Sequence, residues 1–473
     1  MKICVLQPDY STTNVDYKNY DPPRELQHLL PSDTVQTIFL NKLTTYQQLQ
    51  QLKAANFDIY VNLCEGYLDW SVPSIDVIHT LDLLNLPYTG PSAILYDPSK
   101  PLMKYVAYCA GVLTPNFVEL NNQQSIAAQI MQLHFPLFVK PAKAGDSLGV
   151  DEQSLVHNIQ ELTIKKEALI AAGYTDILIE EYIAGKEFTV LVAANANPAN
   201  TCTVFKPVEY QFPQGKQFKT YALKTSELHT DVNKPCNDAQ LEQALKTATE
   251  KIFTGFAGVG YARLDFRVSP TNEIYFLEIN FTCSVFYEAG YEGSADYILQ
   301  LDPIGKAGFL KHIIEEGIAR HEAKQKNYLV KGNSVNGYGI FASKPLKKGS
   351  IVFKLEEASQ RMVTKRHVNN HWNNTQMIDF ENYAYPISDE VYILWNKDPT
   401  KWAPQNHSCQ PNTAYNGLNL IAISNIQEGE ELTFDYANVY DENLKEFICN
   451  CGAINCKKNI SGKKGNSITQ REK

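Results

Sequence analysis

Apolar and polar positions alternate between strand-like and helix-like spacings over residues 1–90. Three short apolar runs predict β-strands and two amphipathic stretches predict helices: 1–6, 34–40 and 59–63 for the strands, and 45–55 and 74–84 for the helices. Strands that alternate with helices build a parallel sheet with helices on its faces. The pattern therefore predicts a doubly wound α/β domain that ends at Gly90-Pro91-Ser92.

Residues 91–322 are expected to form a mixed α+β domain. Residues 94–200 predict, in order, a helix, a strand, a glycine-containing loop, a helix and two strands joined by a turn. Residues 250–285 predict a helix and a long hairpin, and a charged helix at 308–325 closes this part. A linker is expected at 323–329.

Short strands broken by Gly, Asn and Pro follow the linker, as at 331–343 and 351–355, and they predict a mostly β domain. The remaining expected divisions are this β domain at 330–444, a cysteine-rich segment at 445–462 and a flexible tail at 463–473.

Composition narrows the class of protein. A chain of 473 residues exceeds one hydrophobic core, so several domains are expected. The net charge of −9 argues against nucleic-acid binding through a basic surface. No apolar run reaches the length of a membrane-spanning helix, and the apolar start is too short for a secretory signal. We expect a cytoplasmic protein with neither a membrane nor a nucleic acid as partner.

The predicted hairpin at 260–282 brings charged side chains together. Side chains alternate on a strand, so Arg263 and Asp265 share a face, as do Glu278 and Asn280 on the returning strand. Three oxygen ligands on rigid strands suit Mg²⁺, which takes a few carboxylates together with phosphate oxygens. The guanidinium of Arg263, beside these ligands, suits the stabilisation of negative charge that develops in a transition state. The alternative is a solvated hairpin with cross-strand ion pairs.

Two earlier segments suit a nucleotide. In 135–150 an apolar strand ends at Lys140, and a loop with two glycines follows, whose N–H groups can turn toward phosphate. In 177–190 a strand carries Glu180 and Glu181, and Glu187 follows after a turn. These acids suit an exocyclic amine and ribose hydroxyls. The alternatives are a surface turn and ordinary ion-pair partners.

In this order and spacing the three segments resemble ATP-grasp enzymes, most nearly the D-alanine–D-alanine ligase branch. Pro87-Tyr88-Thr89-Gly90 and Lys100-x3-Lys104-x6-Gly111-x2-Thr114-Pro115 resemble the same branch. The resemblance covers 1–320 and implies an ATP-grasp fold, with an α/β N-terminal lobe, two α+β lobes, bound ATP and two Mg²⁺ ions. The residues that it implies are Lys100, Lys140, Ser147, Glu180, Glu181, Ile183, Glu187 and Lys224 for ATP, Asp265, Glu278 and Asn280 for Mg²⁺, and Arg263 for catalysis.

The implied reaction has two steps. A substrate carboxylate attacks the γ-phosphate to give an acyl phosphate, and an amine then displaces phosphate through an oxyanion near Arg263. Two segments depart from the branch: the loop at 7–14 lacks its glutamate, and 281–286 replaces a Pro-Gly-Met turn. Both fall on the amino-acid pocket, so ATP is the expected co-substrate and D-alanine is not the expected substrate.

A second group of chemically informative residues lies near the C-terminus. Cys449-x-Cys451-x4-Cys456 follows Cys409, which stands inside the run Asn406-His407-Ser408-Cys409-Gln410-Pro411-Asn412. Four thiolates complete a structural zinc site, and the alternative is unpaired cysteines. The other six of the ten cysteines are scattered in apolar contexts and are expected to be reduced and packed.

Three further features accompany the cysteines. Gly337-Tyr338-Gly339 supplies two positions without Cβ where backbone can approach a ligand, or else a hairpin turn. Asn406 and His407 suit an adenosyl ligand, or else a structural turn. Tyr436 ends an alternating strand at 431–436, where a tyrosine otherwise belongs to the core or its rim. His367 and His371 in the insert 361–398 are expected to be ordinary surface or core residues.

Together these segments resemble a SET-domain methyltransferase with its post-SET zinc segment, over residues 326–462. The resemblance implies S-adenosylmethionine and Zn²⁺ as cofactors, and Tyr436 as the catalytic tyrosine beside a narrow channel for an amine, usually a lysine. That amine, with a pKa of about 10.4 when free, must lose a proton before it attacks. The implied ligands are Gly337, Tyr338, Gly339, Asn406, His407 and Phe434 for S-adenosylmethionine, and Cys409, Cys449, Cys451 and Cys456 for Zn²⁺.

The chain is therefore expected to be bifunctional, an ATP-dependent carboxylate–amine ligase joined to a methyltransferase. Its expected partners are amino-acid or peptide substrates, with a protein lysine as a further acceptor, and a homodimer is typical of this ligase branch. The alternatives are a protein-lysine methyltransferase whose ATP-grasp half only binds nucleotide, a genuine D-alanine–D-alanine ligase with an accessory SET domain, and a scaffold in which both halves only bind.

Overall fold

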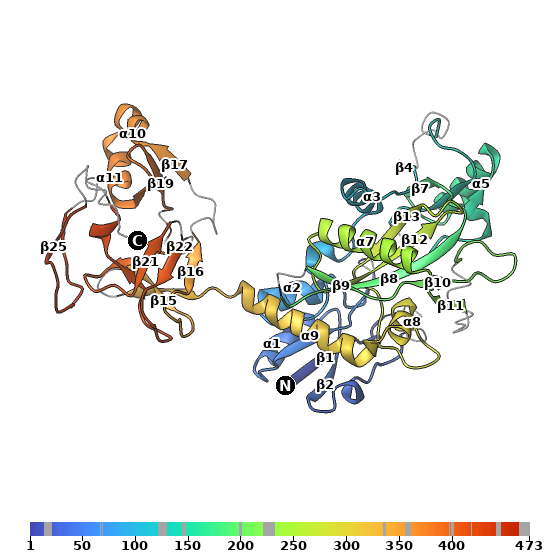
Figure 1. Ribbon diagram of the computed structural model, residues 1–473, viewed down its shortest axis with the longest axis horizontal. Coiled ribbons are helices and arrows are strands. Elements are labelled where there is room, and N and C mark those ends of the chain that lie inside the picture. Colours follow the sequence, from blue (N-terminus) through green and yellow to red (C-terminus); the bar gives the residue numbers. More distant parts are fainter. Residues whose placement is uncertain are drawn as a thin grey trace. The chain divides into compact units, whose positions relative to one another are not determined.

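The computed structural model describes most of the chain in two compact units, residues 1–322 and 323–473 (Figure 1). The described residues are 1–13, 21–66, 68, 70–121, 130–143, 148–197, 201–220, 232–333, 337–354, 361–396, 398, 402–417, 419–440 and 446–462. Among these residues, none of the helices combines the length and the apolar character needed to cross a bilayer.

The first unit begins with a parallel three-stranded sheet of order β2-β1-β3, flanked by helices. Its elements are β1 (Lys2–Pro8), η1 (Gln27–Leu29), β2 (Thr34–Leu40), α1 (Thr45–Lys53), β3 (Ile59–Asn62), α2 (Ile75–Leu83) and η2 (Ala93–Leu95). Cys4 and Leu6 on β1 face α1 and α2, whereas Ile3 and Val5 face α9 (Gly305–Lys324) on the other side (Figure 1). Successive side chains of β1 point to opposite faces of the sheet, so both faces are apolar and both are covered by helices.

A four-stranded antiparallel sheet of order β4-β7-β5-β6 follows, with a helix packed on one face. Helix α3 (Lys100–Cys109) precedes it in the chain, and its elements are β4 (Phe117–Asn121), β5 (Leu137–Pro141), η3 (Glu152–Ser154), β6 (Leu155–Val156), α5 (Ile159–Ala171) and β7 (Asp176–Glu181). Leu162 and Leu169 of α5 are buried against Leu137 and Val139 of β5, and this packing leaves the alternate residues Phe138 and Lys140 for the opposite face.

A six-stranded sheet completes this unit, and β12 at its centre pairs with β8 and β13. Its elements are β8 (Lys186–Ala194), β9 (Cys202–Val204), β10 (Val208–Tyr210), β11 (Asn233–Pro235), α7 (Ala239–Gly255), β12 (Tyr261–Val268), β13 (Ile274–Asn280) and α8 (Ser294–Leu301). The predicted hairpin is therefore present as β12–β13, with a register shift between Asp265 and Phe266. It is joined to the larger sheet through β8, which pairs with β12, and β13 forms an edge of that sheet.

The second unit is rich in short strands, which form five small sheets among its described residues. Its elements are β14 (Tyr328–Asn333), β15 (Gly337–Ala342), β16 (Ile351–Lys354), β17 (Arg361–Thr364), α10 (Lys365–His371), α11 (Asn374–Tyr383), β18 (Ala384–Pro386), β19 (Val391–Leu394), β20 (Asn406–His407), β21 (Thr413–Asn416), β22 (Asn419–Ala422), β23 (Thr433–Phe434), η7 (Tyr436–Asn438), β24 (Phe447–Ile448) and β25 (Asn459–Ile460). The predicted fold class, mixed α+β units followed by a strand-rich unit, is confirmed; the finer domain bounds remain predictions.

One local prediction in this unit is wrong. Residues 431–436 were expected to form one strand, but the strand is confined to Thr433 and Phe434, which pair in parallel with Asn406 and His407, while Glu431 makes an isolated bridge to Phe341. Asp435 caps a short 3-10 helix through its side chain, which accepts the Ala437 N–H. A capping carboxylate competes with ladder pairing, and this explains why the strand ends before Tyr436.

Candidate functional site

A pocket in the first unit collects most of the charged residues that the sequence singles out. It is lined by Lys100, Lys140, Glu180, Glu181, Ile183, Glu187, Arg263, Asp265 and Glu278, together with residues that were not predicted. Strands β5, β7, β12 and β13 supply most of these side chains. Segments more than a hundred residues apart in sequence therefore meet at one site. We call it the charged pocket.

The β12–β13 pairing aligns the carboxylates. Asp265 lies opposite Glu278 in the ladder, and Arg263 lies opposite Asn280, whose Nδ2 is 3.5 Å from Glu278 Oε1. Arg263 Nη2 lies 3.1 Å from Asp265 Oδ2, while the buried Oδ1 has no hydrogen-bond partner among the described residues. A buried carboxylate oxygen without a donor, beside two further oxygen-bearing side chains, fits a divalent cation.

Glu180 holds two lysines inside the pocket wall. Its Oε1 lies 2.5 Å from Lys140 Nζ and its Oε2 lies 2.8 Å from Lys104 Nζ. Burial raises the pKa of Glu180, but the two ammonium groups outweigh burial and lower the pKa to about 2. Lys104 also donates to Thr114 Oγ1 at 3.1 Å. Sequence reasoning used Lys104 only as a spacing mark and assigned it no contact with the site.

Glu187 is held by two cations as well. Lys219 Nζ lies 2.9 Å from its Oε1, and Arg267 Nη2 lies 3.1 Å from its Oε2. Neither cation was predicted as a site residue. Arg267 follows Arg263 and Asp265 at the two-residue spacing of β12, so strand alternation was the signal that pointed to it.

Aromatic rings complete the lining of the charged pocket. Phe138 meets Phe218 edge-on with ring centroids 5.0 Å apart, and it stacks on Tyr182 at 6.4 Å. Phe138 was missed, although it shares a strand face with Lys140. A pocket with aromatic walls and a few charged groups suits a ligand with a planar apolar part and an anionic part. Of the other predicted residues, Ser147 and Lys224 lie outside the described part of the chain.

In the second unit, the four predicted cysteines converge. The sulfur atoms of Cys409, Cys449, Cys451 and Cys456 all lie within 4.8 Å of one another. Burial raises the pKa of the Cys451 thiol, but the N–H groups of Cys409 and Ala453 outweigh it and lower the pKa to about 6. Four sulfurs at this spacing, one of them with a stabilised thiolate, fit a tetrahedral Zn²⁺ site with bonds of about 2.3 Å.

His407 connects this cysteine group to Tyr436. The Tyr436 N–H donates to His407 Nδ1 at 3.1 Å, so the neutral ring carries its proton on Nε2, which faces Cys409 Sγ at 3.3 Å. The Tyr436 hydroxyl donates to the Gln405 carbonyl oxygen at 2.5 Å. The position of Tyr436 is therefore set from both its backbone and its hydroxyl.

Aromatic rings surround Tyr436. The centroids of Phe434 and Tyr440 lie 4.8 Å and 5.1 Å from its own, and Tyr415 packs edge-on against Phe434 at 5.5 Å. Burial raises the pKa of Tyr436 above its usual range, so the hydroxyl stays protonated near neutrality. An aromatic surface with fixed hydroxyls suits a cationic or amine ligand.

The glycine segment β15 meets the same region. Asn406 Nδ2 donates to the Tyr338 carbonyl oxygen at 3.3 Å and to Glu431 Oε1 at 2.6 Å. A Cβ on Gly339 would lie 2.5 Å from Glu431 Oε1 and 2.7 Å from Asn406 Nδ2. A side chain at Gly339 would therefore displace the ends of the Glu431 and Asn406 side chains. His367 and His371 are exposed on α10, as expected.

Comparison with known proteins gives two family matches. Residues 105–286 match the D-ala D-ala ligase C-terminus, and residues 337–437 match the SET domain. The D-alanine–D-alanine ligase of Ectopseudomonas mendocina is 31% identical over 211 residues, which are 42% of this chain and 61% of that protein. The enzyme of Laribacter hongkongensis is 30% identical over 213 residues, 42% of this chain and 62% of that protein.

The chain thus spans about three fifths of the length of these relatives. The crystal structure of D-alanine–D-alanine ligase from Bacillus anthracis complexed with ATP aligns with a TM-score of 0.48 at 19% identity, covering 69% of this chain and all of that one. The sequence matches place the ligase-like region and the SET domain on separate parts of the chain. One polypeptide therefore carries a D-alanine–D-alanine ligase-like region at 105–286 and a region that matches the SET domain at 337–437.

Proposed function

We propose that the first unit is an ATP-dependent carboxylate–amine ligase that works through an acyl phosphate. The observation that carries the proposal is the charged pocket, where cations, carboxylates and aromatic walls occur together. Lys100 and Lys140 are assigned to the phosphates. The backbone of Glu181 and Ile183 is assigned to adenine, and Glu187 to ribose. Glu180 is assigned to the adenine side of the ligand as well, where its lysine pairs hold it in place.

Asp265, Glu278 and Asn280 are the proposed magnesium ligands, and bound Mg²⁺ would neutralise phosphate charge. Arg263 is assigned to the reacting centre. Its guanidinium neighbours Asp265, and its buried Nε has no hydrogen-bond partner in the described parts of the chain. A preorganised donor of this kind stabilises an oxyanion that develops in the transition state.

The two steps follow from these positions. A carboxylate oxygen of the first substrate bonds to the γ-phosphorus as the bond to ADP breaks. The second substrate's amine then bonds to the carbonyl carbon, loses a proton, and phosphate leaves. The departures at residues 7–14 and 281–286 favour a substrate other than D-alanine, because both segments depart from the pattern of the branch at its amino-acid pocket.

The test of this proposal is phosphate release from magnesium-ATP with a panel of amino acids and dipeptides, D-alanine included, together with the product mass. Amino-acid-dependent release with a condensed product supports the ligase, and a D-alanine preference supports a genuine D-alanine–D-alanine ligase. Asp265→Asn should abolish release. Tight ATP binding with no release from any substrate would instead favour a half that only binds nucleotide.

For the second unit we propose S-adenosylmethionine-dependent methylation of an amine, on a lysine or a related group. The fixed position of Tyr436 beside Asn406-His407, within an aromatic group, carries this proposal. Gly337, Tyr338, Gly339 and Phe434 are the other proposed contacts of S-adenosylmethionine. Zn²⁺ at Cys409, Cys449, Cys451 and Cys456 would fix the C-terminal segment.

Methyl transfer from labelled S-adenosylmethionine tests this second activity. The acceptors should include the ligation product and lysine-containing peptides. If both units act in one pathway, the ligation product should be methylated. If the second unit is a protein-lysine methyltransferase, the peptides should be methylated. Tyr436→Phe should slow transfer by about 100-fold through lost positioning and leave S-adenosylmethionine affinity nearly unchanged. An unchanged rate would remove Tyr436 from the mechanism, and labelling of neither acceptor would favour a binding-only unit.

We further propose small amino-acid or peptide substrates, no nucleic-acid or membrane partner, and a homodimer in a cytoplasmic setting. The ten cysteines, all described and none in a disulfide, support a reducing compartment. Size-exclusion chromatography with light scattering tests the dimer.

A further inference from the structure

Gln405 is a buried side-chain amide of the second unit, and 8% of the residue is exposed. Its Nε2 donates to the Tyr415 hydroxyl at 3.0 Å. Its Oε1 is buried and has no hydrogen-bond partner in the part of the chain that the structure describes. One end of the amide is therefore held by the protein, and the other end lacks a donor. We call this side chain the half-paired amide.

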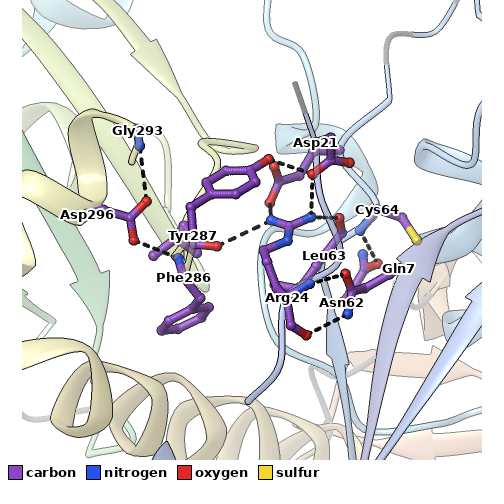
Figure 2. A network of polar contacts seen from close by, with 12 residues as sticks. Gln7, Asp21, Arg24, Asn62, Leu63, Cys64, Phe286, Tyr287, Gly293 and Asp296 are labelled. Atoms are coloured by element: carbon purple, nitrogen blue, oxygen red, sulfur yellow. Dashed lines mark hydrogen bonds and ion pairs between the residues drawn. The ribbon is translucent and has the colours of Figure 1, made fainter. Parts of the chain in front are cut away.

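The buried amide of Gln7 in the first unit provides the contrast (Figure 2). Its Nε2 donates to the Arg24 carbonyl oxygen at 2.8 Å, and its Oε1 accepts the Arg24 N–H at 2.9 Å. Such an amide, paired at both ends, serves to hold the backbone. A buried acceptor without a donor is costly, and it is rare in folded proteins unless a ligand or water satisfies it. The half-paired amide is thus suited to a ligand that brings a donor.

Both ends of Gln405 reach the surroundings of Tyr436. The Tyr436 hydroxyl donates to the Gln405 carbonyl oxygen at 2.5 Å, so these two residues are in direct contact. At the side-chain end, the ring centroid of Tyr415 lies 5.5 Å from that of Phe434, which lies 4.8 Å from that of Tyr436. Gln405 also directly precedes Asn406, a proposed contact of S-adenosylmethionine. Hydrogen bonds and ring contacts therefore place the half-paired amide beside the proposed site of methyl transfer.

The Tyr415 ring that holds the amide belongs to a larger aromatic group. The ring centroid of Tyr385 lies 5.4 Å from that of Tyr415 and 5.8 Å from that of Tyr440, and Tyr440 lies 5.1 Å from Tyr436. Aromatic faces attract a cation, but they do not fix the direction of its N–H bonds. The buried Oε1 of Gln405 adds a directional acceptor to this group.

The missing partner of this acceptor is defined by its chemistry. It must be a donor, which excludes a carboxylate or a phosphate, because these groups bring only acceptors. Trp402 Nε1, three residues earlier in the chain, is a buried donor that also lacks a partner among the described residues, so it does not bond to Gln405. An amine matches the site in two ways, since its charge suits the aromatic faces and its N–H suits the amide oxygen.

We propose that Gln405 Oε1 accepts an N–H of the acceptor amine beside Tyr436 and so restricts methylation to amines that still carry an N–H. The inference rests on the proposed methyltransferase function of the second unit. In each transfer the nitrogen lone pair bonds to the methyl carbon, the carbon–sulfur bond of S-adenosylmethionine breaks, and S-adenosylhomocysteine leaves. Each transfer replaces one N–H by a methyl group. A tertiary amine offers no N–H to Gln405, so a third transfer, which would give a quaternary ammonium, is disfavoured.

The experiment follows methyl transfer from labelled S-adenosylmethionine by the full-length protein to matched acceptors. One series is a lysine-containing peptide with the lysine unmodified, Nε-methylated or Nε,Nε-dimethylated. The other series is butylamine, N-methylbutylamine and N,N-dimethylbutylamine. Wild type should use the tertiary amine of a series with a kcat/KM about 10-fold or more below that of the secondary amine, because the buried acceptor would stay unpaired. Mass spectrometry should show dimethylated product and almost no trimethylated product.

Gln405→Met keeps the length of the side chain and removes both polar ends of the amide. It should lower kcat/KM for the primary and secondary amines by about 10-fold and bring them close to the tertiary amine. Comparison of the two proteins at one pH cancels the different solution pKa values of the amines. If the discrimination is only steric, Gln405→Met leaves it unchanged, and that result overturns the role of Gln405. Equal use of all three amines by wild type overturns it as well.

Two controls complete the test. Gln427→Met changes an exposed amide of the same unit and should leave the discrimination unchanged. Thermal melting and zinc content show whether Gln405→Met folds; if it does not, Gln405→Asn keeps the amide, draws it back by one methylene, and should lose part of the discrimination. Full discrimination in a folded Gln405→Asn would count against the proposed contact. Labelling of none of the amines by wild type overturns the methyltransferase proposal itself, and the inference with it.

Discussion

Glu180 offers a direct test of how the charged pocket is built, through the substitution Glu180→Gln. The side chain is 3% exposed and lies between the ammonium groups of Lys104 and Lys140, at 2.8 Å and 2.5 Å. A shift of its pKa from 4.5 to about 2 corresponds to about 3 kcal/mol of stabilisation. Removal of one partner from a buried pair costs about 3–5 kcal/mol. We expect Glu180→Gln to destabilise the first unit by about 3 kcal/mol or more.

The pH dependence gives this prediction a second, independent result. The folded pKa of Glu180 lies below the unfolded value, so its stabilisation is complete above pH 4.5 and is lost as the pH falls toward 2. The difference between wild type and Glu180→Gln should therefore be constant from pH 5 to 8 and shrink below pH 4.5. Urea unfolding followed by hydrogen exchange of the β5 and β7 peptides reports on this unit alone.

Glu167→Gln is the matched control, because Glu167 is exposed on α5 in the same unit. Its effect should stay within about 0.5 kcal/mol. A loss below about 1 kcal/mol for Glu180→Gln, or a difference that persists unchanged to pH 2.5, would refute the view that this carboxylate stabilises two buried cations.

Three other predictions concern single positions. Arg24→Met should destabilise the first unit by about 3 kcal/mol in thermal or urea unfolding, because Asp21 would lose its buried guanidinium; a loss under about 1 kcal/mol would contradict this. Cys451→Ser should lower the zinc content from about one ion per chain to near zero by atomic emission, and equal zinc in both proteins would exclude Cys451 as a ligand. Gly339→Ala should cost about 1–3 kcal/mol and weaken S-adenosylmethionine binding in calorimetry, because its Cβ would lie 2.7 Å from Asn406 Nδ2; a neutral result would mean that Asn406 moves freely.

Strand alternation made much of the charged pocket predictable from sequence. Arg263 and Asp265 stand two residues apart, as do Glu278 and Asn280, so each pair had to share a face once the strands formed. The cysteines were predictable for a similar reason, since close spacing of metal-type ligands is a local property. These features depend on residue type and spacing, which the sequence states directly.

Tertiary structure decided which charged groups pair with charges of opposite sign. Lys104 on α3 meets Glu180 on β7, and Glu65 meets Arg24, through packing that no local spacing encodes. Tyr436 begins a 3-10 helix rather than ending a strand, because the Asp435 side chain caps the backbone there. Burial and ion pairing depend on where separate elements pack. The sequence by itself therefore determined the chemical groups of each site, and only the folded chain determined their partners and their charge balance.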